Sequence, residues 1–238
     1  MIKIETCLTP EILSLHQLEG KIAVVTDVLR ATSCMVAGLN AGVNSVIPVM
    51  KVEEALEYQK KGFITAGERG GVKVEEFTIG NSPFEHMQEE YHGKDICMTT
   101  TNGTVAITEA KKTAKEVIIG ALLNVGTVAE YLKEQNQDIV IICAGWKGNP
   151  SLEDTLFAGA LIHRLQDQAK LTDDASFMAL AQYQQANGKV ADVIQNYASH
   201  AKRLSGLKAK SDLSFCAQED YCSILPILNG EAITIKKN

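Results

Sequence analysis

"IAVVTDVLRATS", residues 22–33, is the stretch that decides the fold. Its first part, "IAVVT" at residues 22–26, is apolar along its length and rich in β-branched side chains, and so is "IVIIC" at residues 139–143. Such runs are typical of strands that are buried on both faces of a parallel sheet. A helix-period segment, Ser33–Ala41, follows the first run, so the stretch predicts a strand that leads through a short polar loop into a helix.

This alternation continues to about Lys170. Strands are expected at Lys21–Thr26, Ser45–Val49, Phe63–Ala66, Asp95–Thr99, Glu116–Gly120 and Ile139–Cys143. Helices are expected at Ser33–Ala41, Val52–Lys61, Pro83–Glu90, Thr104–Ala114, Gly126–Glu134 and Ser151–Gln168. The pattern predicts an α/β fold: a mostly parallel sheet with helices on both faces. A helical C-terminal portion follows, and Asn229-Gly230 predicts a terminal β-hairpin.

No proline- or serine-rich linker interrupts the chain, so we expect one compact domain over residues 1–238. Residues 21–61 and 95–134 share a strand-helix-strand-helix plan, which leaves open two internal halves, 1–90 and 91–238. The sequence does not determine the oligomeric state, and a homodimer is one of the alternatives.

Composition excludes several classes of function. The net charge of −6 and a pI near 5.4 argue against a nucleic-acid-binding protein, which usually has a basic face. The N-terminus has no unbroken apolar segment of the signal-peptide kind, and no stretch is apolar enough to cross a membrane, so we expect a cytoplasmic protein. The six cysteines form no CxxC pair, which favours reduced, buried thiols over zinc or disulfides.

Polar residues collect where the predicted strands end, and ligands of parallel sheets bind beyond these carboxyl ends. After the first strand come Asp27 and Arg30, and then Thr32 and Ser33, which open a helix. Either hydroxyl suits an ordinary helix N-cap. A cap does not explain the acid and the arginine, and an arginine at this place can bind phosphate or sulfonate oxygens.

One further strand end, and a helix start that follows it, have a similar character. Glu68 and Arg69 precede Gly70-Gly71, which allow the backbone to approach a ligand closely, although a turn with a surface ion pair is the simpler reading. Next, Asn81 and Ser82 precede Pro83 at a helix start, where either is a good cap and a ligand could share the same amides.

The stretch "MTTTNGT", residues 98–104, has more polar groups than one turn requires. A helix start presents free N–H groups and the positive end of its dipole, which together favour phosphate. We therefore interpret this stretch as an anion-binding loop that uses Thr100, Thr101, Asn102, Gly103 and Thr104.

The last strand end leads through a loop containing Gly145 to a helix with two acids, Glu153 and Asp154, in its first turn. Acids are common at this position because of the helix dipole. Here they would share one crevice with Asp27 and Glu68. Carboxylates repel phosphate unless a cation lies between them, so the pattern favours Mg²⁺ and phosphoryl chemistry. The loops of P-loop NTPases and of dinucleotide-binding proteins are absent.

Taken together, the motifs resemble the 2-phosphosulfolactate phosphatase family, in order and along nearly the whole chain. The motifs are "DVLRATS" (27–33), "GERGG" (67–71), "GNSP" (80–83), "TTTNGT" (99–104), "CAG" (143–145) with "SLED" (151–154), and "SHAKRL" (199–204) with "DLSFCAQED" (212–220). The resemblance implies a Mg²⁺-dependent phosphatase that hydrolyses 2-phospho-3-sulfolactate to 3-sulfolactate and phosphate, a step toward coenzyme M. It also implies an α/β fold peculiar to that family.

We place the roles as follows. Asp27, with Glu153 or Asp154, would hold Mg²⁺, and Arg30 and Arg69 would bind phosphate and sulfonate. A carboxylate, Glu68 or Asp154, would orient the attacking water, and Asn102 would act with the threonines on the transferred group. The family pattern leads us to expect Gly-Phe-Asp where this chain has Glu76-Phe77-Thr78, and a different substrate is expected if the missing aspartate contacts the metal or the substrate.

Three alternatives stay open: a phosphatase for another phosphorylated 2-hydroxy acid, a non-catalytic binder of a phosphorylated or sulfonated metabolite, and an enzyme of other chemistry such as a phosphate-dependent lyase. The expected partner is in each case a small anionic molecule. None of the five histidines follows a strand end, and His200, within "SHAKRL", is the one to check in a structure.

Overall fold

The computed structural model describes residues 1–204 and 207–237. Eleven strands form one mixed sheet, in the order β5-β4-β6-β3-β11-β10-β7-β2-β8-β1-β9. The strands are β1 (Ile2–Cys7), β2 (Ile22–Thr26), β3 (Ser45–Pro48), β4 (Ile64–Arg69), β5 (Val72–Lys73), β6 (Asp95–Thr99), β7 (Glu116–Gly120), β8 (Ile139–Cys143), β9 (Ala169–Leu171), β10 (Pro226–Asn229) and β11 (Ala232–Ile235).

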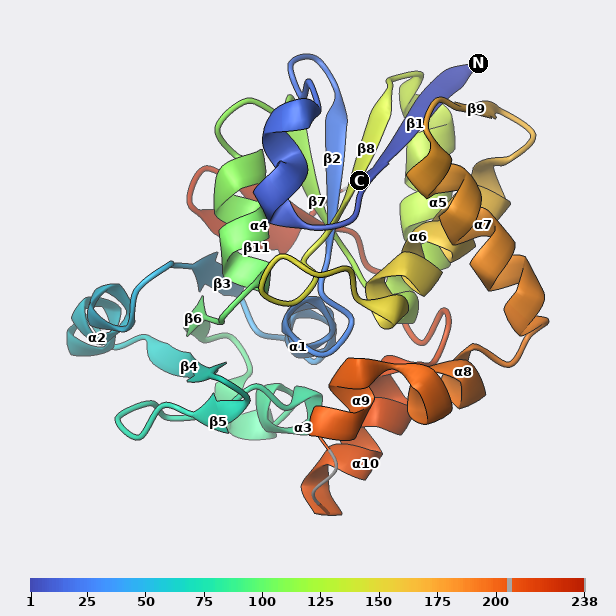
Figure 1. Ribbon diagram of the computed structural model, residues 1–238. Helices are drawn as coiled ribbons and strands as arrows, with labels where there is room; N and C mark the ends of the chain where they lie inside the picture. Colours follow the sequence, from blue (N-terminus) through green and yellow to red (C-terminus); the bar gives the residue numbers. More distant parts are fainter. Residues whose placement is uncertain (205–206, 238) are drawn as a thin grey trace.

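The α-helices are α1 (Ala31–Asn40), α2 (Val52–Lys60), α3 (Pro83–His86), α4 (Gly103–Ala110), α5 (Val125–Gln135), α6 (Leu152–Leu165), α7 (Asp174–Ala186), α8 (Val190–Tyr197), α9 (Ser199–Arg203) and α10 (Leu207–Cys216). Short 3₁₀ helices cover Pro10–Leu15, Glu89–Tyr91 and Leu122–Asn124. In Figure 1, α6 and α7 lie on one side of β2 and β8, and α4 lies on the other.

The central strands are buried on both faces, as their apolar composition predicts. Ile22 and Val24 of β2 belong to one apolar cluster, with α5 and α6, while Ala23 and Val25 belong to a second, with α1 and α4. Strand β8 divides in the same way. This alternation is what a strand between two helical layers requires.

The C-terminal hairpin lies in the middle of the sheet and joins two blocks of parallel strands. Strands β4, β6 and β3 are parallel to one another, and so are β7, β2, β8, β1 and β9. Between the blocks, β10 pairs antiparallel with β7, and β11 pairs antiparallel with β3. The hairpin turns at Gly230, whose φ of +63° suits glycine.

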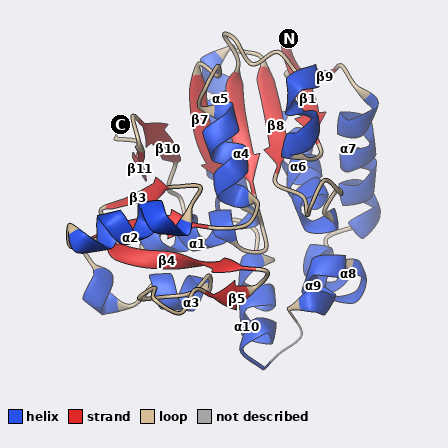
Figure 2. Cartoon of the chain, turned by 60° about the vertical axis from the view of Figure 1, so that its left-hand side comes forward, coloured by secondary structure: helices blue, strands red, loops and turns tan. Residues whose placement is uncertain are grey.

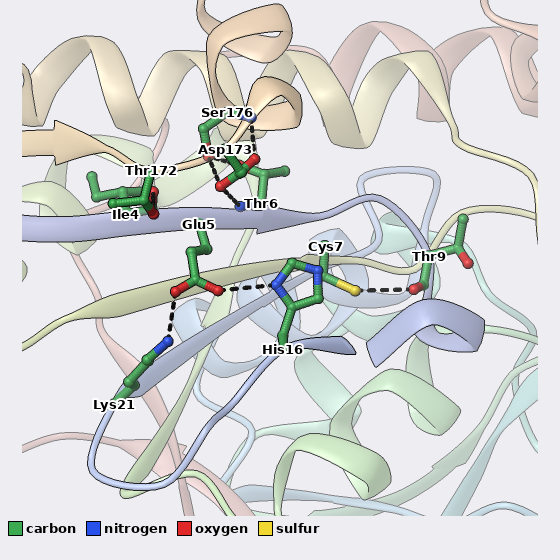
Figure 3. Close-up of polar contacts among 10 residues, drawn as sticks. All are labelled: Ile4, Glu5, Thr6, Cys7, Thr9, His16, Lys21, Thr172, Asp173 and Ser176. Carbon is green, nitrogen blue, oxygen red and sulfur yellow. Dashed lines mark hydrogen bonds and ion pairs between the residues drawn. The ribbon is translucent and has the colours of Figure 1, made fainter. Parts of the chain in front are cut away.

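Strand β1 is held by the segment that leads into α7, as Figure 3 shows. The Thr6 backbone N–H donates to Asp173 Oδ2 (3.2 Å), and the hydroxyls of Thr6 and Ser176 lie 2.8 Å apart. Asp173 is also the N-cap of α7, since it accepts from the Ser176 N–H at 2.7 Å. One aspartate therefore fixes both the strand and the helix.

Helices α8, α9 and α10 gather below the carboxyl ends of β2 and β8, beside β5 and α3 (Figures 1 and 2). They bring the C-terminal part of the chain to the edge of the sheet where ligands of parallel α/β proteins bind. All six cysteines are buried and free. No helix of the described residues has the length and apolar character that a membrane span needs.

The α/β class, the parallel strands, the helical C-terminal portion and the terminal hairpin are confirmed. Strands β1, β5 and β9 were not expected; β9 is three residues long, and β5 is two. Two helices are shorter than expected: α4 ends at Ala110 and α6 at Leu165. The expected helix Pro83–Glu90 is a short α3 and a separate 3₁₀ turn. Division into domains stays a prediction.

We predict that Ile233→Ala destabilises the protein far more than Ile235→Ala. Both residues are on β11, but Ile233 is fully buried and pairs with Val46, whereas Ile235 is 37% exposed. Removing a buried isoleucine side chain costs about 2–5 kcal/mol. Urea unfolding, followed by circular dichroism, measures the difference. Equal losses would mean that the hairpin does not join the two blocks through its buried face.

Candidate active site

Two adjoining cavities open at the carboxyl ends of the strands. The larger, of about 370 Å³, lies between β5, α3 and α10, and the smaller, of about 20 Å³, lies nearer to β2. Both are lined by Arg30, Glu68, Gly71 and Asn81. Ser82 lines only the larger cavity, and Asp27 and Asn102 line only the smaller one. The structure thus brings seven residues from four distant sequence segments to one crevice.

Asp27 follows β2 and faces the N-terminal end of α4. A Cβ added at Gly103 would lie 2.7 Å from Asp27 Oδ2 and 2.6 Å from the Ala31 Cβ, so only glycine lets the carboxylate approach this closely. The Ala31 backbone N–H donates to the same carboxylate. The positive end of the α4 dipole therefore meets the protein's own anion.

Glu68, at the end of β4, is fixed by backbone amides. Its Oε1 accepts from the Thr101 N–H (2.8 Å), and its Oε2 accepts from the Gly71 N–H (2.6 Å) and from the Thr101 hydroxyl (3.2 Å). These bonds tie the end of β4 to the loop that follows β6, and they explain why Thr101 is polar.

Arg30 lines both cavities, and only part of its guanidinium is engaged by another side chain. One amino group of its guanidinium forms an ion pair with Asp212 of α10, whose other oxygen accepts from the Ser82 hydroxyl at 2.8 Å. Asp212 is only 2% exposed. The remaining donors of the guanidinium are available to an anion in either cavity.

The two acids of α6 differ in their partners. Asp154 Oδ1 accepts from the Val28 N–H (2.9 Å) and Oδ2 from the Gly145 N–H (3.0 Å), so Asp154 joins the loops after β2 and β8. Glu153 Oε1 lies 3.0 Å from His200 Nδ1, and its Oε2 is buried without a hydrogen-bond partner. His200 lines the smaller cavity and packs against Trp146.

The carboxylates are close enough to affect one another. Burial, together with the charges of Glu68 and Glu153, raises the pKa of Asp27 to about 6, although His200 and the Ala31 N–H act in the opposite direction. Burial also raises the pKa of Asp154, and Glu153 and Asp27 add to the effect. The site therefore holds more negative charge than its own cations neutralise.

This excess charge fits a divalent cation. Asp27 lines the smaller cavity. Glu153 lines neither cavity, but its buried Oε2 has no hydrogen-bond partner, so both side chains have oxygen atoms to offer. Asp154 uses both oxygens on backbone amides. In the described residues, three or more Asp, Glu, His or Cys side chains do not converge as a ready metal site. Mg²⁺ commonly uses only one or two carboxylates, with water and phosphate oxygens completing its octahedron.

Several residues predicted from the sequence lie elsewhere. Hydroxyls of Thr32 and Ser33 are buried and donate to the carbonyls of Asp27 and Val28. Thr100 and Thr104 bond to each other across the loop, at 3.1–3.3 Å. Gly145 lines neither cavity, and its φ is +58°.

Arg69 also lines neither cavity. Its guanidinium donates to the carbonyls of Glu68 and Met50 and to the Thr99 hydroxyl. Substrate binding by these residues stays a prediction. Glu76 and Thr78, which depart from the expected pattern, line neither cavity either.

Other cavity residues had no predicted role. His200 and Asp212 lie in the quoted motifs "SHAKRL" and "DLSFCAQED", which offered a signal; Trp146 follows a glycine in the loop after β8. Lys73, on the exposed strand β5, had no signal at all, because a lone surface lysine resembles many others.

We predict that Asp27→Asn stabilises the metal-free protein at pH 7.5. The folded-state pKa, about 6, exceeds the ordinary value of 3.8, so ionising Asp27 costs folding free energy. This cost is absent below about pH 4, grows as the pH rises through 6, and then amounts to about 3 kcal/mol. Urea unfolding in EDTA at several pH values measures it.

The matched control is Asp192→Asn, which changes an exposed aspartate of α8 and should leave stability nearly unchanged. An Asp27→Asn variant that is no more stable than the wild type at pH 7.5 would show that the carboxylate is not strained.

Comparison with known proteins agrees with this arrangement of motifs. Residues 7–231 match the family described as 2-phosphosulpholactate phosphatase. A protein of Thermotoga maritima named "Probable 2-phosphosulfolactate phosphatase" is 42% identical over 219 residues, which cover 92% of this chain and 94% of that protein. A Clostridium acetobutylicum protein of the same name is 37% identical over 236 residues, or 98% and 100% of the two chains. The chain belongs to the 2-phosphosulfolactate phosphatase family, which makes it a phosphoric monoester hydrolase.

Proposed function

We propose that this protein is a Mg²⁺-dependent phosphatase that converts 2-phospho-3-sulfolactate and water into 3-sulfolactate and phosphate. The observation that carries the proposal is the group of buried carboxylates near Arg30, at a crevice whose larger cavity, of about 370 Å³, is large enough for a three-carbon ester. The names of the family and of its members support the substrate. A place in coenzyme M formation, in the cytoplasm, is part of the same proposal.

Asp27 and Glu153 are the residues that would hold the metal ion. Bound there, Mg²⁺ neutralises phosphate charge and polarises the phosphoryl group. Arg30 binds a phosphoryl oxygen with the donors that Asp212 leaves free, and Asp212 keeps the guanidinium in place.

Glu68 is the better candidate for orienting the attacking water. It lines both cavities, and its Oε1 accepts only the Thr101 N–H, so this oxygen keeps a lone pair for water. Asp154, the other residue considered, lines neither cavity and serves to join two loops. Phosphoryl transfer needs mainly positioning and charge neutralisation, which these residues supply.

The threonines have a supporting role in this proposal. The bonds between Thr100 and Thr104, and from Thr101 to Glu68, hold the loop after β6 in shape. Asn102 lines the smaller cavity, and its side chain makes no cap bond to α4. It therefore stays available to the transferred group.

We expect Asp27→Asn to lower Mg²⁺-dependent phosphate release from 2-phospho-3-sulfolactate by roughly 100- to 10,000-fold. The reason is that the amide offers a metal ion no charge. Phosphate is measured with and without Mg²⁺ and after EDTA treatment. Asp192→Asn serves again as the matched control and should retain wild-type activity.

A binder of the same metabolite would give a different result. It would bind 3-sulfolactate without Mg²⁺-dependent release of phosphate from any of a panel of phosphorylated 2-hydroxy acids. Release from other members of the panel, but not from 2-phospho-3-sulfolactate, would identify a phosphatase of different specificity. Product analysis would reveal a lyase, because phosphate would then leave without 3-sulfolactate.

A further inference from the structure

The larger cavity has a cation that the catalytic arrangement does not use. Lys73, on β5, lines this cavity, and its Nζ donates to the Thr78 carbonyl at 3.3 Å. Among the described residues, no carboxylate forms an ion pair with it. A lysine that keeps its charge unpaired beside a cavity is available to an anionic ligand.

The other charged residues that line this cavity are already engaged. Arg30 is paired with Asp212. Glu85 accepts from the Gly80 N–H at 2.6 Å, and Glu68 accepts from two backbone amides. Of the two cations on the wall of the larger cavity among the described residues, Lys73 is therefore the one without a carboxylate partner.

The position of Lys73 is set by the backbone around it. Its backbone lies opposite that of Glu68 in the antiparallel β4–β5 hairpin. The hairpin turns through Gly70 and Gly71, whose φ values are +62° and +86°. On the other side, a Cβ added at Gly80 would lie 3.5 Å from the Lys73 Cβ. Strand pairing and this close packing hold the stem of the lysine at the cavity wall, while the ammonium stays free to move.

A substrate with two acidic groups besides its phosphate needs a second cationic contact. The sequence suggested Arg69, but its guanidinium is bonded to Glu68, Met50 and Thr99 and lines neither cavity. Asp27 lines only the smaller cavity, so the metal and the phosphoryl group would bind at that end of the crevice. The larger cavity is left for the group that does not react.

We propose that Lys73 is a specificity-determining residue whose ammonium binds the acidic group on the substrate carbon next to the ester carbon, which in 2-phospho-3-sulfolactate is the sulfonate. The inference rests on the proposed function, and it names the residue that separates this substrate from the same ester without a sulfonate. Lys73 takes no part in the hydrolysis itself.

The test compares two esters that differ only in this group: 2-phospho-3-sulfolactate and 2-phospholactate. Lys73→Ala should lower kcat/KM for the sulfonated ester roughly 10- to 100-fold, as expected for the loss of one charge-assisted hydrogen bond. The loss should be in KM, because this contact is equally strong before and during the reaction. For 2-phospholactate the change should be smaller than about threefold.

Two further variants separate charge from structure. Lys73→Arg should restore most of the preference, since it keeps the positive charge. Lys60→Ala, which changes a lysine of α2 that is 70% exposed, should alter neither ester. Equal losses for both esters, or no loss for either, would overturn the proposal.

A binding measurement tests the role of Lys73 without relying on hydrolysis of the ester. Trp146 is the only tryptophan of the chain and lines the smaller cavity, so its fluorescence can report occupancy. Lys73→Ala should weaken 3-sulfolactate binding about tenfold or more and leave lactate binding nearly unchanged. If the wild type binds 3-sulfolactate and Lys73→Ala weakens this binding, but neither ester is hydrolysed, the phosphatase assignment fails and the role of Lys73 in binding stands. If it does not bind 3-sulfolactate, the role of Lys73 is refuted.

Discussion

Four carboxylates, from the ends of β2 and β4 and the start of α6, are buried near one crevice, and burial and their neighbouring charges raise the pKa of Asp27 and of Asp154. The chain offsets the cost of ionising the carboxylates in different ways. Backbone amides bind Glu68 and Asp154, and the imidazole of His200 binds one oxygen of Glu153. One backbone amide donates to Asp27, and the charge of His200 and the end of α4 also favour its ionised form. The pKa of Asp27 is nevertheless raised to about 6, so a cation bound beside it would relieve part of the cost of ionising it, and this links the stability of the metal-free protein to the chemistry of the site.

The C-terminal helices supply what the sheet alone lacks. His200, on α9, meets the acid at the start of α6, and Asp212, on α10, meets the arginine at the start of α1. Both contacts are long-range in sequence, 47 and 182 residues apart, so the site is completed only when α8, α9 and α10 are in place. The hairpin that follows these helices then enters the middle of the sheet. The C-terminal part of the chain therefore contributes to the core through β10 and β11 and to the site through α9 and α10.

Sequence patterns predicted the parts of the site that the sheet positions directly. Parallel strands end at one edge, so the residues that follow β2, β4 and β8 were expected to converge, and Asp27, Glu68 and Asp154 do so. What the pattern could not tell is which partner each side chain would choose. The hydroxyls of Thr100 and Thr104 could equally well bind a phosphate or nearby backbone groups, and in the structure each bonds to the backbone of the other residue. Arg69 and Lys73 are both cations near the same hairpin, and only their local backbone decides that the arginine turns away from the cavity while the lysine lines it.

The two cavities of the crevice differ in the charged residues that line them. Asp27 lines only the smaller cavity and Lys73 lines only the larger one, while Arg30 and Glu68 line both. An anionic group in the smaller cavity would face the carboxylates of Asp27 and Glu68, whereas in the larger cavity Lys73 adds a second cation to Arg30, beside Glu85 and Asp212. Under the proposed function, the phosphoryl group can occupy the acidic end only together with a cation, so binding of the metal and binding of the phosphoryl group must favour each other by the same factor. The group that does not react then has to face the lysine, because no second position on the wall offers an unpaired positive charge among the described residues.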